Sequence, residues 1–128
     1  MTTAMETTGS SLALDVLLGD WRNTNAAGRI ARIICRPAAN GRMTVQCHGR
    51  AAEGMRDWGA VEAPVYSFTF ESREAGAFSA VVDHGFEEVH LQANVKSGVL
   101  VVASFNRIKD GSLSSYFDRE FFHRVGEG

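Results

Sequence analysis

The sequence predicts an all-β fold, an eight-stranded antiparallel up-and-down barrel preceded by a short N-terminal helix. Glycines recur at thirteen-residue steps in both halves of the chain: Gly28, Gly41 and Gly54, then Gly85, Gly98 and Gly111. The segments between these glycines are rich in Val, Ile, Phe, Tyr and Thr, which favour strands. Turn-forming dipeptides such as Asn40-Gly41 and Asp110-Gly111 stand between the segments. One strand and one tight turn per step is the pattern of a meander.

The composition is that of one domain with a real core. The chain has 128 residues, of which 45% are hydrophobic and 22% charged. We expect residues 11–125 to form the barrel domain and residues 1–10, rich in Thr and Ser, to form a disordered tail. The net charge of -2 argues against a nucleic-acid partner held by bulk charge. No apolar run approaches the ~20 residues of a membrane helix, so we expect no membrane partner.

The predicted elements follow in chain order. A helix is expected over 10–18, where a serine that can cap a helix precedes several apolar residues. Strands are expected over 19–25, 29–36, 42–49, 64–73, 77–84, 86–95, 99–108 and 113–124, with a further short strand over 56–62. Eight strands of this length can close a barrel, and closure removes the exposed edges.

Two-residue turns at 84–85, 97–98 and 110–111 predict the register of the last four strands. They predict these cross-strand pairs: Val82 with Glu87, Glu88 with Arg107, Asn106 with Ser115, and Val102 with Arg119. The opposite charges of Glu88 and Arg107 support the register of their hairpin.

This register divides the side chains between two faces. The face predicted to be the interior collects apolar residues: Phe78, Ala80, Val82, Val89, Leu91, Ala93, Val95, Leu100, Val102, Phe117 and Phe121. By parity, Tyr66, Phe68 and Phe70 join it. Polar residues predicted on the same face are His84, Glu87, Ser104, Asn106, Ser115 and Arg119. The outer face is predicted to carry an apolar patch, covered by the N-terminal helix or by a second subunit: Val99, Val101, Phe105, Tyr116 and Phe122.

Four polar residues are expected to gather at one end of the barrel. Glu87, Asn106 and Ser115 lie at strand ends there, and His84 lies at the adjoining turn. A buried carboxylate beside an amide, a hydroxyl and an imidazole can orient a polar ligand or move a proton. The alternative is a solvated rim without a function.

Two further residues have both a functional and a structural interpretation. Arg119 is predicted on the inner face, where it binds a ligand carboxylate or packs on a tryptophan. Trp58 follows a loop that interrupts the regular spacing of the hairpins. We therefore expect it either to stack on a flat ligand or to plug the barrel.

Other kinds of site find no support in the sequence. The four histidines show no spacing typical of metal ligands, and we expect neither a metal nor a cofactor. A nucleophile elbow and a phosphate-binding glycine loop are both missing. The two cysteines, Cys35 and Cys47, form no disulfide framework, which favours a cytoplasmic location.

The segment Leu17-Leu18-Gly19-Asp20-Trp21 resembles the G-x-W start of the calycins, the superfamily of lipocalins, fatty-acid-binding proteins and avidins. The resemblance is one of architecture and covers about 19–124. It implies a helical turn before the first strand and a basic residue of the last strand packed over Trp21, here Arg119 or Arg124. The avidin biotin-contact pattern and the lipocalin cysteines are not present.

The chain also resembles a group of small bacterial proteins of no established function. The matching segments are Asn23-Thr24-Asn25, Asp57-Trp58-Gly59, Gly85-Phe86, and Asp110-Gly111-Ser112 through Tyr116 to Arg119-Glu120. In that group a cysteine precedes D-W-G, whereas here the residue is Arg56. Any disulfide that this cysteine forms in the group is therefore absent from this chain.

The sequence thus favours a barrel that binds a small, largely apolar or amphipathic molecule in its lumen. The candidate ligand-binding residues are Trp58, Tyr66, Phe68, Phe78, Asn106, Ser115, Phe117 and Arg119. The alternative is an enzyme of the cyclase or isomerase type that uses the same lumen, with Glu87 and His84 as its acid–base pair. A third interpretation is a barrel with a filled core that acts only through its outer patch. The sequence also allows a homodimer that forms through that patch.

Overall fold

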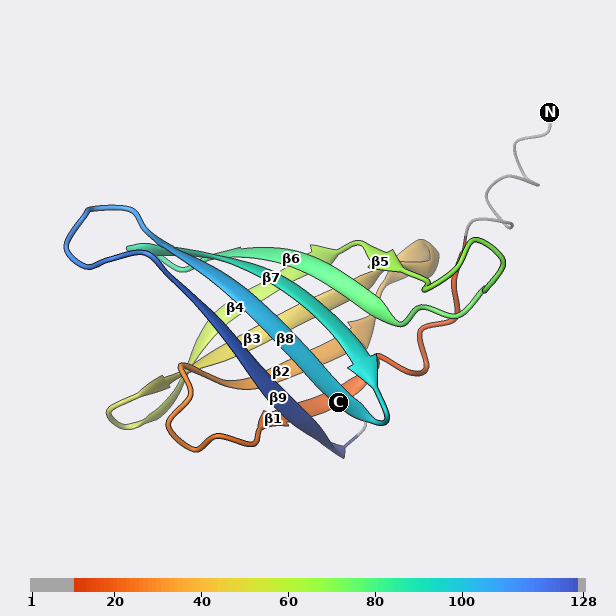
Figure 1. The fold of residues 1–128 in the computed structure, drawn as a ribbon, viewed down its shortest axis with the longest axis horizontal. Coiled ribbons are helices and arrows are strands. Elements are labelled where there is room, and N and C mark those ends of the chain that lie inside the picture. Colours follow the sequence, from red (N-terminus) through yellow and green to blue (C-terminus); the bar gives the residue numbers. More distant parts are fainter. Residues whose placement is uncertain (1–10, 127–128) are drawn as a thin grey trace.

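The computed structural model describes residues 11–126, which form nine strands of one antiparallel sheet curled into a nearly closed barrel (Figure 1). The strands are β1 (Gly19–Asn23), β2 (Ile30–Pro37), β3 (Met43–Ala51), β4 (Gly54–Ala63), β5 (Val65–Tyr66), β6 (Ala77–Asp83), β7 (Glu87–Lys96), β8 (Val99–Ile108) and β9 (Tyr116–Gly126). Their order is β4-β3-β2-β1-β9-β8-β7-β6-β5. Strands β4 and β6 contact each other across the remaining seam without a hydrogen-bonded ladder.

The all-β barrel is confirmed, with two differences in its elements. The short strand expected over 56–62 is the full-length β4, which makes nine strands rather than eight. The expected helix is not found in the described part of the predicted span, 11–18; Ser10, its proposed cap, lies outside the described residues. Ala13 instead forms a parallel bridge with Glu74, which leaves only one turn before Gly19, too short for a helix. Within 11–126 we find no helix with the length and apolar character of a membrane span.

The register of the central hairpin is confirmed. Glu88 lies opposite Arg107 in the β7–β8 ladder. The turn between β6 and β7 is longer than predicted, so Val82 faces Val89 instead of Glu87. A slip of two residues keeps every side chain on its predicted face.

The predicted register of β9 is wrong by one residue. Asn106 lies opposite Tyr116 rather than Ser115, and Val102 lies opposite Glu120 rather than Arg119. The connection is not a two-residue turn, because the hydroxyl of Ser115 accepts a hydrogen bond from the Ile108 amide before β9 begins. A slip of one residue exchanges the two faces of a strand.

Strand β9 therefore presents the opposite set of side chains to the interior. Phe122 is 1% exposed inside the barrel, and Tyr116 also lies on the inner face. Phe117, Arg119 and Phe121 lie on the outer face, so their predicted inner positions are wrong.

The strand predicted over 64–73 ends after Tyr66. The following loop is held by local side-chain bonds, among them that of the Ser67 hydroxyl to the Thr69 carbonyl, 2.5 Å. Such bonds compete with a strand ladder. Tyr66, Phe68 and Phe70 are exposed, and their predicted place in the interior is wrong.

The core fills the barrel and is closed at one end by Trp21. The largest fully buried side chains include Trp21, Phe78, Phe122, Leu17, Ile33, Met43, Leu91 and Leu100. The indole N–H of Trp21 donates to the Leu17 carbonyl at 2.9 Å. Arg124 of β9 lies over the ring, 4.6 Å from its centroid, and donates to the Val16 carbonyl. Of the two basic residues considered, Arg124 covers Trp21, and this geometry is consistent with a calycin-like barrel.

Both cysteines are free and lie in this core. Desolvation raises the pKa of the Cys35 thiol to about 12, and it raises the pKa of Cys47 as well. Both thiols are therefore protonated at neutral pH and act as small apolar side chains.

Asp20 should make stability sensitive to acid. Its carboxylate accepts two bonds from Arg32, at 3.0 and 2.7 Å, and these bonds hold the pKa of Asp20 below its usual value. A depressed folded-state pKa stabilises the fold above about pH 4, and this stabilisation is lost as pH falls through the folded value. We expect Asp20→Asn to cost about 1–2 kcal/mol at pH 7 and less at pH 3 by urea unfolding. The same cost at both pH values would contradict this role.

Candidate functional site

One end of the barrel gathers polar side chains, and we call it the mouth. The loops 24–29, 52–53, 84–86 and 109–115 all lie at this end, on the left of Figure 1. We define the mouth by six residues: Arg29, Trp58, His84, Glu87, Asn106 and Tyr116. The predicted gathering of Glu87, His84 and Asn106 is found here, and Trp58 joins them.

Glu87 is the centre of the mouth. It begins β7, and its side chain is 0% exposed. One carboxylate oxygen, Oε1, lies 2.5 Å from Nη2 of Arg29 and 2.8 Å from Nε2 of His84. The other oxygen, Oε2, is buried and has no hydrogen-bond partner within residues 11–126. A buried carboxylate oxygen without a donor is costly, so this atom is a candidate contact for a ligand.

A bulge in β4 turns Trp58 into the mouth. Gln46 pairs with Ala60 and His48 with Asp57, so Trp58 and Gly59 together oppose one residue of β3. Gly59 takes a φ of +94°, a conformation that favours glycine, and its amide donates to the Asp57 carboxylate at 2.8 Å. The D-W-G segment is therefore the device that aims the indole inward.

The indole is seated on glycine and stacked on histidine. A Cβ atom at Gly49 would lie 2.2 Å from the Trp58 ring, so only glycine leaves room for it. The Trp58 and His84 rings are stacked, 4.0 Å apart at 6°, and Phe86 meets His84 edge-on at 5.7 Å. Trp58 comes from β4 and His84 follows β6, so the stack covers the seam where these strands share no ladder.

Tyr116 brings a second unpaired group to the mouth. Its hydroxyl is buried and has no hydrogen-bond partner in the described part of the chain. Burial raises the pKa of Tyr116, an effect that Arg29 opposes and Glu87 reinforces. The phenol therefore keeps its proton at neutral pH and can donate to a ligand.

A small polar space lies beside Arg29, Asn106 and Tyr116 of the mouth. It is lined by Arg29, Ile30, Val102, Ser104, Asn106, Tyr116, Asp118, Glu120 and Phe122, and its volume is about 10 Å³, the size of one water site. The amide of Asn106 donates to the Ser104 hydroxyl at 3.0 Å and to the Tyr116 carbonyl at 3.3 Å. These bonds fix the amide but leave the Glu87 and Tyr116 oxygens unpaired.

The segments that carry the second resemblance meet at this end. Asn23 and Asn25 donate to the two carboxylate oxygens of Glu120, at 2.7 and 2.8 Å. The hydroxyl of Thr24 donates to the Phe121 carbonyl at 2.9 Å. With Trp58 and Phe86 in the stack, the N-T-N, D-W-G, G-F and R-E segments all help to shape the mouth.

Ser115 also lies at this end of the barrel, but its hydroxyl is used to cap β8 by accepting a bond from the Ile108 amide. The remaining predicted ligand-binding residues lie elsewhere, and Phe78 is part of the packed core. Phe117 and Arg119 are on the outer face, where the guanidinium lies 5.5 Å from the Phe117 ring centroid. Tyr66 and Phe68 lie at the opposite end of the barrel.

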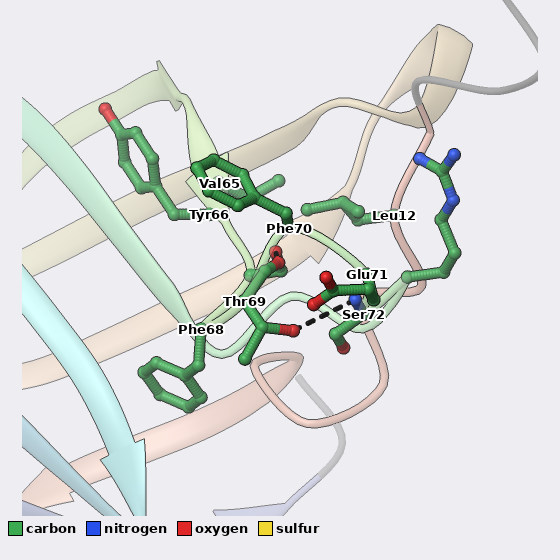
Figure 2. Close-up of a pocket in the computed structure, with 10 residues that line it drawn as sticks. Leu12, Val65, Tyr66, Phe68, Thr69, Phe70, Glu71 and Ser72 are labelled. Atoms are coloured by element: carbon green, nitrogen blue, oxygen red, sulfur yellow. Dashed lines mark hydrogen bonds between the residues drawn. The ribbon is translucent and has the colours of Figure 1, made fainter.

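Those two residues belong to an open hollow of about 570 Å³ (Figure 2). Leu12 and Val65 supply its apolar base, and the loop that follows Tyr66 forms its wall. Figure 2 shows Phe68 and Phe70 pointing to different sides of this loop. Tyr66, Phe68 and Phe70, which were expected in the lumen, are thus exposed to solvent.

Arg29 was not predicted at the mouth, and Tyr116 was predicted on the outer face of the barrel. A bulge between Ile30 and Arg32 breaks the alternation of β2, so no periodicity points to Arg29. For Tyr116 the missing information was the length of the 109–115 loop. The serines of this loop were the signal available in the sequence, because serine hydroxyls commonly bond to nearby backbone groups.

We find no cluster of metal ligands in the described residues and no known relative of the chain. Within 11–126 no three His, Cys, Asp or Glu side chains are grouped to hold a metal ion. No protein-family model, curated protein or solved structure matches this chain.

Proposed function

We propose that the protein is a small-molecule-binding β-barrel whose mouth recognises the polar end of its ligand. The observation that carries this proposal is the pair of buried, unpaired oxygens, Oε2 of Glu87 and the hydroxyl of Tyr116. A carboxylate oxygen accepts hydrogen bonds, so the ligand group must donate one, as a hydroxyl or an amine does. A ligand that satisfies both atoms recovers the cost of their burial.

The seam between β4 and β6 supplies the access route in this proposal. No ladder bonds need to break there, and the Trp58–His84 stack covers the seam at the mouth. The largely apolar body of the ligand extends into the lumen. Because the polar space measures about 10 Å³, binding requires the side chains below it to move apart.

The second candidate is an enzyme that uses the same site. It is favoured by one observation, the contact of 2.8 Å between His84 Nε2 and the buried Glu87 carboxylate. An imidazole paired with a carboxylate can accept and return a proton. In this case Glu87→Gln should abolish turnover while binding survives; equal loss of both would indicate binding alone.

The chain offers a matched pair of variants for the test. Tyr116→Phe removes only the unpaired hydroxyl, and Thr44→Val removes a hydroxyl from the outer face of β3, away from both the mouth and the other hollows. We would incubate each protein with a bacterial small-molecule extract and measure filter-retained compounds by mass spectrometry. Wild type and Thr44→Val should retain the same compound, and Tyr116→Phe about tenfold less, with an unchanged or higher Tm.

Three outcomes of this experiment separate the readings. Equal retention by Tyr116→Phe and wild type would overturn the role of the mouth. A compound converted to a new species would identify an enzyme, and its mass change would give the reaction class. Retention of nothing would favour the filled barrel that acts through its surface.

A further inference from the structure

The outer face of β6–β9 carries a hollow that is separate from the mouth. We call it the outer hollow and define it by Tyr66, Ala77, Ser79, Gln92, Ala103 and Arg119. Its volume is about 490 Å³, within the range of small-molecule sites. None of these six residues belongs to the mouth.

The sheet register explains the shape of the outer hollow. Ser79, Gln92, Ala103 and Arg119 stand opposite one another across four strands, and Ala77 lies in the neighbouring row with Tyr66 beside it. Ala77 and Ser79 of β6 and Ala103 of β8 form the floor on either side of β7, which contributes the amides of Gln92 and Asn94. Tyr66 and Arg119 stand at its two ends, four strands apart, which is about 19 Å along the sheet.

The charge of this face is positive. We consider the outer side chains of β6–β9 that lie between the β7–β8 turn and the cross-strand row that contains Glu88. In the described chain, these side chains include Lys96 and Arg119 but no carboxylate. Glu88 itself is paired with Arg107 at 3.1 Å. The one contact we find for the Arg119 guanidinium in the described chain is the Phe117 ring, which holds it in place without neutralising it.

Apolar surface surrounds this positive charge. Val81, Phe105, Phe117 and Phe121 are each about half exposed on the same face. A second copy packed here about a two-fold axis would place two copies each of Arg119 and Lys96 in one interface, and this part of the face has no carboxylate to pair with them. The combination of a concave floor, an apolar surround and an uncompensated guanidinium fits an anionic small molecule better than a second copy.

We propose that the outer hollow binds an amphipathic monocarboxylate. Arg119 binds the carboxylate, for which the planar guanidinium offers two parallel N–H donors. The apolar chain lies across Ala103 and Ala77 toward Tyr66. This site is independent of ligand binding at the mouth.

Decanoate is a suitable probe, with decan-1-ol as its uncharged counterpart. We would titrate each into ¹⁵N-labelled protein and follow the amide shifts. Decanoate should give saturable shifts centred on Ala77, Gln92 and Ala103, and decanol should bind at least about tenfold more weakly. Shifts centred on the mouth, or on the loop that follows Tyr66, would overturn the assignment.

Three variants complete the test. Arg119→Gln removes the cation and Ala103→Leu fills the floor, and both changes are on the outer face, outside the buried core. Each should weaken decanoate binding about tenfold or more, whereas Arg56→Gln, on β4, should not change it. Equal binding by Arg119→Gln and wild type would overturn the proposal. Concentration-dependent shifts of the same amides without decanoate would do so too, because they would show that a second copy covers the face.

Discussion

Truncation of Phe122 to alanine is expected to destabilise the protein by about 3–5 kcal/mol. Phe122 is 1% exposed and lies among the largest side chains of the core. Its loss removes buried apolar surface and leaves a cavity on the inner face of β9. Urea unfolding at pH 7 measures the change, and a shift of the midpoint without a change of slope would show that stability alone has changed.

The neighbouring phenylalanine is the control. Phe121 is 48% exposed on the opposite face of the same strand, so Phe121→Ala should cost less than about 1 kcal/mol. The two-residue turn predicted from the sequence would give the reverse order, with Phe121 in the core. A larger loss for Phe121→Ala than for Phe122→Ala would therefore contradict the register of β9.

Replacement of Arg29 by methionine is expected to cost about 2–3 kcal/mol. The change removes the cation from Glu87, whose side chain is 0% exposed, and leaves a buried carboxylate with His84 as its remaining partner. A broken buried ion pair typically costs about 3–5 kcal/mol. We expect the lower figure because the Arg29 side chain is 42% exposed and solvent screens part of the interaction.

A double-mutant cycle isolates this pair. Arg29→Met combined with Glu87→Leu should be more stable than Arg29→Met alone, since the second change removes the stranded charge. Arg56→Met on the exposed surface of β4 controls for the loss of an arginine as such and should be nearly neutral. Strictly additive effects of the Arg29 and Glu87 changes would show that the two side chains do not stabilise each other.

The turns that contain glycine were the most informative part of the sequence for the fold. Ser97-Gly98 closes the β7–β8 hairpin as predicted, because two residues with positive φ fit the twist of the strands. The Asp110-Gly111 turn was misleading because the chain continues through Ser115 before pairing resumes. Local composition identifies a turn, but the length of the loop depends on bonds made by its polar side chains.

The candidate site was predictable only where the register of the strands was predicted correctly. Glu87 and Asn106 were placed correctly because β7 and β8 have the predicted register. Tyr116 was misplaced along with the rest of β9, and Arg29 depends on a bulge in β2 that no repeat reveals. Trp58 was recognised as notable, but its inward direction depends on the conformation of Gly59.

The most direct test of the proposed function is a crystal structure of the protein with the compound that the wild type retains from the extract. We expect a hydroxyl or amine of that compound within hydrogen-bond distance of Oε2 of Glu87 and of the Tyr116 hydroxyl. We also expect the Trp58 and His84 rings to move or repack around the compound. A compound bound elsewhere, with both oxygens still unpaired, would show that the mouth is not the binding site.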